Sequence, residues 1–255
     1  MRVESLTFEN LHGQKLSGRL DTPSEATPEA LVLFAHCFTC SKNLTAVVHI
    51  SRALTNAGYA VFRFDFTGLG ESEGDFAKSS FVSHVDDVEA AAHYLAQQGL
   101  APGVLVGHSL GGTAVLHAAP SVHSCRAVAV IGAPFNPTHV SRLLHPHRKT
   151  LQRDGAVEIV LGGKTVRIGR GFLEEIPDEE IERRLAGIRQ PLLVLHAPED
   201  TVVSVENGER LFRAARHPKS FVALSGADHL LSDKKDAQYV GEVLAVWAKR
   251  FILTS

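Results

Sequence analysis

The chain has 255 residues, a length that α/β proteins often reach as one unit, and we expect residues 1–255 to form a single domain. Hydrophobic residues make up 44% and charged residues 21%, the profile of a soluble globular protein with a large core. The formal net charge of −2 gives no electrostatic reason to expect nucleic acid or an anionic membrane surface as a partner.

The first ten residues alternate polar and apolar side chains, with Val3, Leu6 and Phe8 among the apolar ones. This is a strand pattern, and it lacks the apolar run and the cleavage site of a signal peptide. No segment approaches the roughly 18 uninterrupted apolar residues of a membrane span. The three cysteines are few and odd in number, unlike a disulfide scaffold. We therefore expect a reduced, cytoplasmic protein.

Two strand-like runs, 3–8 and 15–20, open the sequence, and their alternation suits an antiparallel pair with one face in water. Later runs are short and almost wholly apolar, as in central parallel strands that are covered on both faces. These runs are residues 31–35, 60–64, 104–106, 127–131, 192–195 and, more weakly, 220–224.

Segments with helical periodicity separate the apolar runs. Apolar side chains recur on one helical face in residues 81–95 and again in residues 239–251. Strands that alternate with helices form right-handed crossovers in an open sheet. The sequence therefore predicts an α/β fold with a mostly parallel, eight-stranded sheet flanked by helices.

Residues 134–189 interrupt this alternation, because they are too many for one crossover helix. Strand-like runs at 157–160 and 165–168 around Gly162-Gly163 predict a hairpin, and a charged helix is expected over 177–185. We interpret the segment as a small lid insertion over the carboxyl edge of the sheet.

Apolar side chains of this insertion are candidates for the wall of a substrate pocket. They are Leu143, Leu144, Phe172 and Leu173. A compact lid favours a small-molecule substrate with a short acyl chain.

Gly107-His108-Ser109-Leu110-Gly111 matches the pattern G-x-S-x-G. It lies directly after the run 104–106 and before an alanine-rich helical segment, 113–119, which is the context that the motif requires. A serine in so sharp a turn is strained and presents its hydroxyl, and the helix start directs free N–H groups toward it. These features identify Ser109 as a nucleophile. The alternative is an incidental serine in a glycine-rich connection.

A nucleophilic serine needs a base, and the base needs an acid that fixes its tautomer. Where the serine sits on such a turn, the acid and then the histidine follow it along the chain. Asp200 lies just past a late apolar run, and His229 lies beyond the last one. Both positions are at strand carboxyl ends, where open α/β sheets place their sites. Glu199 is the alternative acid, and a turn or capping role is the alternative for Asp200.

The tetrahedral intermediate of acyl transfer needs two backbone N–H donors. Leu110, directly after the nucleophile, supplies one. We assign the other to Phe38, in the loop after the third strand-like run, and we interpret His36 as a brace of that loop.

Two other patterns point to different chemistry. Cys37-x-x-Cys40 has the spacing of a thiol–disulfide motif, so a thiol-redox or partner-binding protein on this scaffold is an alternative. His139, His145 and His147 lack nearby cysteine or carboxylate spacing, so a polar lid segment is favoured over a metal site. We predict neither a metal nor an organic cofactor.

Taken together, these residues resemble the α/β-hydrolase superfamily over the whole chain. Residues 33–42, 63–72 and 214–221 are similar to the hydrolase half of bacterial proteins in which an α/β-hydrolase is fused to a C-terminal OsmC-type domain. The feruloyl and cinnamoyl esterases are also similar, with a His-Gly-Phe-Thr-Gly loop and a compact lid. The resemblance implies that the N–H of Phe38 is an oxyanion donor, and that an OsmC-type domain is a possible partner.

The chain differs from these related families at two points. Cys37 occupies the place of a glycine in those esterases, and the chain ends at Ser255, where the fused relatives continue into their second domain. The function that we predict is hydrolysis of small carboxylic esters through Ser109, His229 and Asp200. A thioesterase or amide hydrolase with the same three residues is an alternative, since the same groups serve all acyl transfers.

Overall fold

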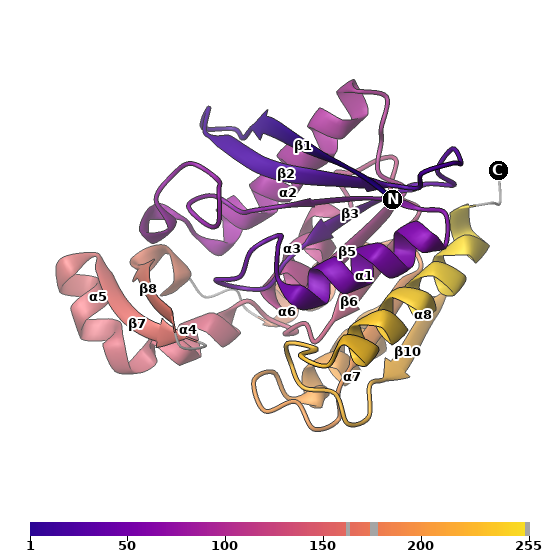
Figure 1. Ribbon diagram of the computed structural model, residues 1–255. Helices are drawn as coiled ribbons and strands as arrows, with labels where there is room; N and C mark the ends of the chain where they lie inside the picture. Colours follow the sequence, from indigo (N-terminus) through magenta and orange to yellow (C-terminus); the bar gives the residue numbers. More distant parts are fainter. Residues whose placement is uncertain (162–163, 174–177, 253–255) are drawn as a thin grey trace.

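The computed structural model of the protein describes residues 1–161, 164–173 and 178–252. Within these ranges, one eight-stranded sheet forms the centre of the molecule, in the order β1-β2-β4-β3-β5-β6-β9-β10 (Figure 1). Its strands are β1 (Arg2–Glu9), β2 (Lys15–Thr22), β3 (Leu31–Ala35), β4 (Ala60–Phe64), β5 (Val104–His108), β6 (Ala127–Ile131), β9 (Leu192–His196) and β10 (Lys219–Ala223). β2 pairs antiparallel with both β1 and β4, whereas all other neighbours in this sheet, from β4 through β3, β5, β6 and β9 to β10, pair in parallel.

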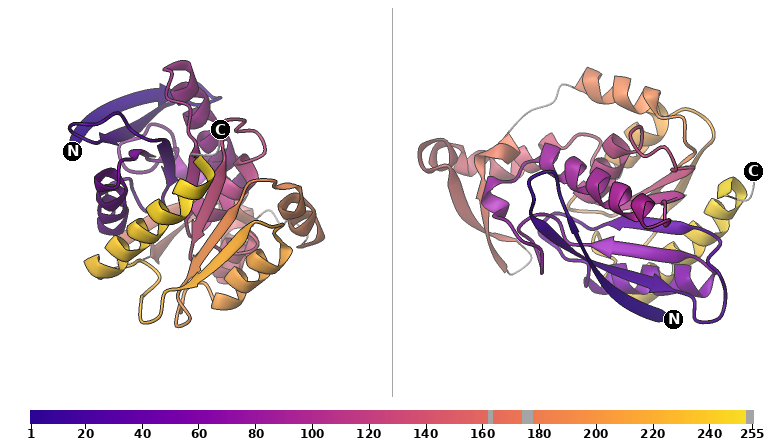
Figure 2. Two further views of the ribbon diagram at one scale, coloured as in Figure 1. Left: turned by 90° about the vertical axis from the view of Figure 1, so that its right-hand side faces the viewer. Right: turned by 90° about the horizontal axis from the view of Figure 1, so that it is seen from above.

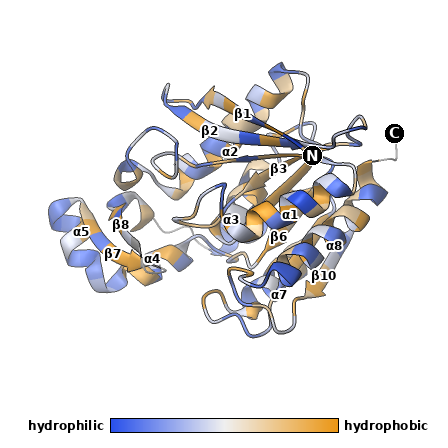
Figure 3. Ribbon diagram, in the orientation of Figure 1, coloured by the Kyte–Doolittle hydropathy of each residue, from blue (hydrophilic) through white to orange (hydrophobic). Residues whose placement is uncertain are grey.

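Helices cover both faces of the sheet. Successive strand residues point to opposite faces, so Leu33 packs into one core and its neighbours Val32 and Phe34 into the other. α1 (Thr45–Asn56) and α8 (Lys234–Ile252) cover the second of these faces, and α2 (Phe81–Gln97) and α3 (Leu110–Ala118) cover the first (Figures 1 and 2). Figure 3 shows the apolar central strands between these amphipathic helices. The predicted α/β fold, with a mostly parallel eight-stranded sheet flanked by helices, is confirmed.

The segment between β6 and β9 adds several short elements, all of which except α6 lie at one end of the molecule, whereas α6 lies against α3 (Figures 1 and 2). They are α4 (Thr138–Leu144), η2 (His145–His147), α5 (Arg148–Asp154), β7 (Ala156–Leu161), β8 (Lys164–Gly169), η3 (Arg170–Leu173) and α6 (Asp178–Gly187). β7 and β8 form the expected antiparallel hairpin, while its predicted turn at Gly162-Gly163 and the start of the predicted helix at Pro177 lie outside the described residues.

This insertion rests on η1 (Phe76–Lys78), the short helix that precedes α2. A side chain at Gly169 would collide with the carbonyl of Ala77, and one at Gly171 would press on the carbonyl of Ser79. Backbone therefore touches backbone at this junction, which only glycine permits. The last helix before β10 is α7 (Val205–Ala214), whose Leu211 joins the core beneath α2 and α3.

The expectation that all cysteines are reduced is wrong for one pair. Cys37 and Cys40 form a disulfide, while Cys125 is free and buried. The N–H of Cys40 donates to the carbonyl of Cys37 at 3.1 Å, and this turn brings the two Cα atoms to 5.4 Å, inside the usual range for a disulfide. Among the described helices, none has the length and apolar character that a membrane crossing requires.

Candidate active site

Ser109 lies in the sharp turn between β5 and α3. Its backbone has φ 54° and ψ −127°, a conformation that non-glycine residues rarely adopt. The turn is held because the N–H of Ser109 donates to the carbonyl of Ile131 on β6 at 2.8 Å. A side chain at Gly107 would collide with the backbone of Gly111, so both glycines of the motif are needed for strand and helix to approach.

His229 joins Ser109 to Asp200. Its Nε2 lies 3.0 Å from the Ser109 hydroxyl oxygen, and its Nδ1 lies 2.6 Å from Oδ2 of Asp200. Ser109 comes from the end of β5, Asp200 from the loop after β9, and His229 from the loop after β10. The structure thus brings together the three residues that the sequence singles out.

Asp200 is held as a carboxylate by its surroundings. Its Oδ1 accepts hydrogen bonds from the N–H groups of Val202 and Val203, both at 2.8 Å. Burial acts to raise the pKa of Asp200, but the hydrogen bonds from His229, Val203 and Val202 outweigh burial and hold this pKa below its usual range. An ionised Asp200 is suited to stabilise a positively charged His229.

The neighbouring acids face elsewhere. Glu199 accepts a hydrogen bond from the N–H of Gly226, and Asp228 accepts one from the N–H of Ser232. Asp228 therefore closes a turn next to His229, and Glu199 does not replace Asp200 as the partner of the histidine.

Two buried histidines that the sequence analysis did not assign hold the loops of the site. Nε2–H of His108 donates to the carbonyl of His229 at 2.7 Å, and Nε2–H of His196 donates to the carbonyl of Val203 at 2.8 Å. Burial, together with the nearby His229, lowers the pKa of His108 to about 3. His108 is therefore neutral at working pH and serves as a fixed donor. The only sequence signal is that each histidine ends a central strand.

The loop after β3 begins against the nucleophile turn. A side chain at Gly111 would collide with the carbonyl of His36, so this loop and the start of α3 are in backbone contact. The N–H of Leu110 is the first of α3, where helical N–H groups have no acceptor within the helix. Within the described part of the chain, the N–H of Phe38 also makes no hydrogen bond. Both N–H groups are thus free to donate, and their role as oxyanion donors stays a prediction.

Buried polar groups fix both ends of this loop. The ring of His36 donates from Nδ1 to the carbonyl of Cys37 at 2.8 Å, as expected for a brace. Lys42, which is 1% exposed, binds Asp65 through its backbone N–H at 2.6 Å and through Nζ at 2.5 Å. Arg63 donates to the carbonyl of Lys42 at 2.5 Å.

The predicted pocket residues occupy different environments. Phe172 is buried, and its ring packs 5.1 Å from that of Phe38, which also contacts Phe76 at 5.4 Å. Leu144 is fully buried, whereas Leu143 is 47% exposed. Phe172 is therefore in contact with the loop at the site, and the role of these residues in substrate binding stays a prediction.

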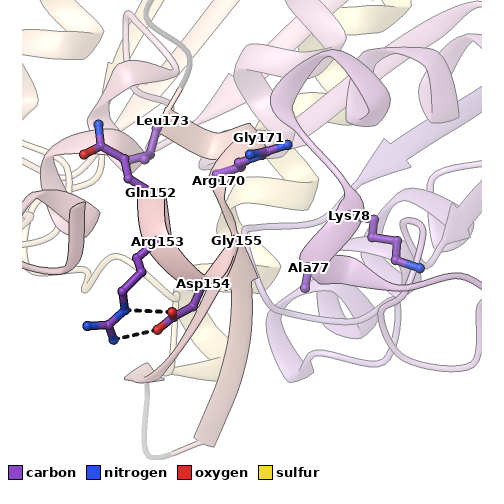
Figure 4. A pocket seen from close by; sticks show the side chains of 9 residues that line it. All are labelled: Ala77, Lys78, Gln152, Arg153, Asp154, Gly155, Arg170, Gly171 and Leu173. Atoms are coloured by element: carbon purple, nitrogen blue, oxygen red, sulfur yellow. Dashed lines mark hydrogen bonds and ion pairs between the residues drawn. The ribbon is translucent and has the colours of Figure 1, made fainter. Parts of the chain in front are cut away.

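A hollow of about 770 Å³ lies beside the insertion and not at Ser109 (Figure 4). Its lining consists of Ala77, Lys78, Gln152, Arg153, Asp154, Gly155, Arg170, Gly171 and Leu173. Arg153 is paired with Asp154 there at 2.8 Å. Because Ser109, Asp200 and His229 are absent from this lining, the hollow is separate from the candidate site. In the described ranges, no cluster of three or more His, Cys, Asp or Glu side chains is arranged to hold a metal ion.

Known proteins share this sequence and fold. The family described as "Serine aminopeptidase, S33" matches residues 26–154, just over half of the chain. The esterase domain of a Rhodothermus marinus protein is 46% identical, with a TM-score of 0.79 over 99% of this chain and 100% of that one. The mitochondrial palmitoyl-protein thioesterase ABHD10 of Rattus norvegicus is 33% identical over 213 residues, covering 80% of this chain and 70% of the relative.

Est1E from Butyrivibrio proteoclasticus, solved with ferulic acid, is 18% identical with a TM-score of 0.77, over 97% of this chain and 99% of that one, and shares the fold. The family match, the esterase-domain neighbour and the geometry around Ser109 point to the same class of enzyme. The chain belongs to the serine aminopeptidase S33 family and is an α/β-hydrolase.

Proposed function

We propose that the protein is a serine carboxylesterase that cleaves small carboxylic esters through Ser109, His229 and Asp200. The observation that carries the proposal is the position of His229, whose two ring nitrogens lie 3.0 Å from the Ser109 hydroxyl oxygen and 2.6 Å from an Asp200 carboxylate oxygen. This is the arrangement in which a histidine removes the proton of a serine nucleophile.

The reaction follows from these contacts. His229 Nε2 takes the proton of Ser109, and the serine oxygen attacks the ester carbonyl. Asp200 stabilises the imidazolium, and the N–H groups of Phe38 and Leu110 donate to the oxyanion. His229 then gives its proton to the departing alcohol, and water hydrolyses the acyl-enzyme by the same route. Side chains and backbone donors supply every group in this scheme, so it requires no cofactor.

Esters are preferred over thioesters in this proposal. The relative with 46% identity is described as an esterase domain, whereas the thioesterase is 33% identical. Thioester hydrolysis is the second candidate, because it proceeds through the same acyl-enzyme and has a relative in its favour.

The test compares p-nitrophenyl butyrate with butyryl-coenzyme A, an ester and a thioester of the same acyl group. We expect kcat/KM to be higher for the ester, and Ser109→Ala to lower kcat by at least about 10⁴-fold. Ser5→Ala, at an exposed position on β1, is the matched control and should leave turnover unchanged. A higher kcat/KM for the thioester would favour the second candidate, and turnover retained by Ser109→Ala would reject both.

A further inference from the structure

The Cys37–Cys40 disulfide lies inside the loop that carries Phe38. The bond joins the residues on either side of Phe38 and Thr39. Thr39 has φ 61°, a region that β-branched residues rarely adopt. Cys40 Sγ also lies 3.6 Å from the carbonyl oxygen of Phe38. A covalent bond therefore closes the loop around the backbone that would hold the oxyanion.

The two bonded cysteines differ in access from solvent. Cys37 is 2% exposed, whereas Cys40 is half-buried. Cys40 is therefore the more accessible of the two to an external thiolate. The C-x-x-C spacing is also that of cysteine pairs that undergo thiol–disulfide exchange. The third cysteine, Cys125, is buried, and burial raises its pKa to about 12, which leaves it an unreactive thiol.

We propose that the Cys37–Cys40 bond is a redox-active modification site that controls hydrolysis at Ser109, with the bridged form active and the dithiol form slow. The inference rests on the proposed function, because Phe38 matters here as an oxyanion donor. An external dithiol is the reductant, and a disulfide of the same class restores the bond.

The direction of the effect follows from how the loop is held. His36 is fixed by its contact with the carbonyl of Cys37, and Lys42 is fixed by Asp65. Opening the disulfide therefore frees mainly the residues between these anchors, and Thr39 is free to leave its positive φ. The N–H of Phe38 then loses its preset direction. Loss of one oxyanion donor typically lowers kcat by about 10²–10³-fold. Because the turn hydrogen bond between Cys40 and Cys37 can persist, we expect a loss of about tenfold.

The external dithiol is the only other reactant that the thiol–disulfide exchange requires. One thiolate of the reductant attacks Cys40 Sγ, and the bond to Cys37 breaks with its electron pair going to Cys37 Sγ, which takes a proton. The second thiol of the reductant then displaces Cys40 from the mixed disulfide. The protein gains two thiols, and the reductant becomes a cyclic disulfide.

The experiment equilibrates the native protein with mixtures of reduced and oxidised dithiothreitol over a range of ratios. One portion is unfolded and alkylated with iodoacetamide, and its mass counts free thiols. The other portion is desalted, because dithiothreitol itself cleaves activated esters, and is assayed with p-nitrophenyl butyrate. Cys125→Ser is the matched control and should respond as the wild type does, with one adduct fewer.

We expect the adduct count to rise from one to three as kcat falls by about tenfold, with KM changing less than twofold and reoxidation restoring kcat. The double variant Cys37→Ser, Cys40→Ser should have the lower kcat and should not respond to dithiothreitol. The inference is overturned if kcat stays constant while the count rises, or if the count stays at one in every mixture. Failure of the proposed function is a separate result, in which the fully bridged protein turns over no ester.

Discussion

His229 is oriented from two sides. Asp200 faces its ring, and the neutral ring of His108 donates to its backbone carbonyl. The sequence predicted Ser109, Asp200 and His229 because a motif and the order of strand ends mark them. It did not predict His108 or His196 as donors, since a buried histidine that binds a carbonyl leaves no repeating pattern. It also did not predict the bond between Cys37 and Cys40, which depends on a turn that closes in three dimensions.

The choice of acid gives a prediction at the level of single residues. Asp200→Asn should lower kcat for p-nitrophenyl butyrate by about 10³–10⁴-fold, because an amide neither fixes the correct tautomer of His229 nor stabilises its charge. Glu199→Gln is the adjacent control and should change kcat less than about twofold. If Glu199→Gln carried the larger loss, Asp200 would not be the partner of the histidine.

Loops at the carboxyl ends of β3, β5, β9 and β10 build the site, and the central strands were predictable because their runs are almost wholly apolar. The short helices of the insertion were not. α5 (Arg148–Asp154) buries only Leu151 among its residues, so it has no apolar stripe to recognise. The packing of the insertion against η1 depends on the contact of Gly169 with Ala77, and no local sequence pattern predicts this contact.

The anchor of the loop after β3 gives a prediction at the level of elements. Lys42→Met should lower the free energy of unfolding by about 3–5 kcal/mol, because it leaves the buried carboxylate of Asp65 without its cation. Lys249→Met is the control, because Lys249 is 55% exposed in its pair with Glu29 and such pairs contribute about 1 kcal/mol or less. Urea unfolding measures both, and equal losses would contradict the anchoring role.

For the whole molecule, the parallel direction of most strands was the most predictable property, since alternating strands and helices admit few topologies. The position of the insertion over the sheet and any association with an OsmC-type domain stay predictions. Asp87 of α2 forms hydrogen bonds to segments that are far from it in the sequence, and no sequence pattern predicts these contacts. It accepts hydrogen bonds from Thr67, after β4, and from Asn10, directly after β1.

Asp87 gives a prediction about overall stability. Burial raises its pKa to about 6 from 3.8, although hydrogen bonds from Thr67 and Asn10 act in the opposite direction. The folded protein thus holds this proton more tightly than the unfolded chain. Its stabilising effect is present below about pH 4 and is lost as the pH rises through about 6.

The difference in unfolding free energy between wild type and Asp87→Asn should therefore fall by about 2–3 kcal/mol from pH 4 to pH 7. Urea titrations at several pH values measure this difference. Any effect of the amide that does not depend on pH is the same at both pH values and cancels in the change. A difference that does not vary with pH would show that Asp87 does not titrate in this range.

The central claim is that Ser109 is a nucleophile activated by His229, and covalent labelling with a fluorophosphonate tests it most directly. Intact mass and peptide mapping after labelling should find one adduct, on Ser109. Ser109→Ala should take up none, and His229→Gln should label at least about 10³-fold more slowly. An adduct on another residue, or equal labelling of the wild type and Ser109→Ala, would contradict the claim.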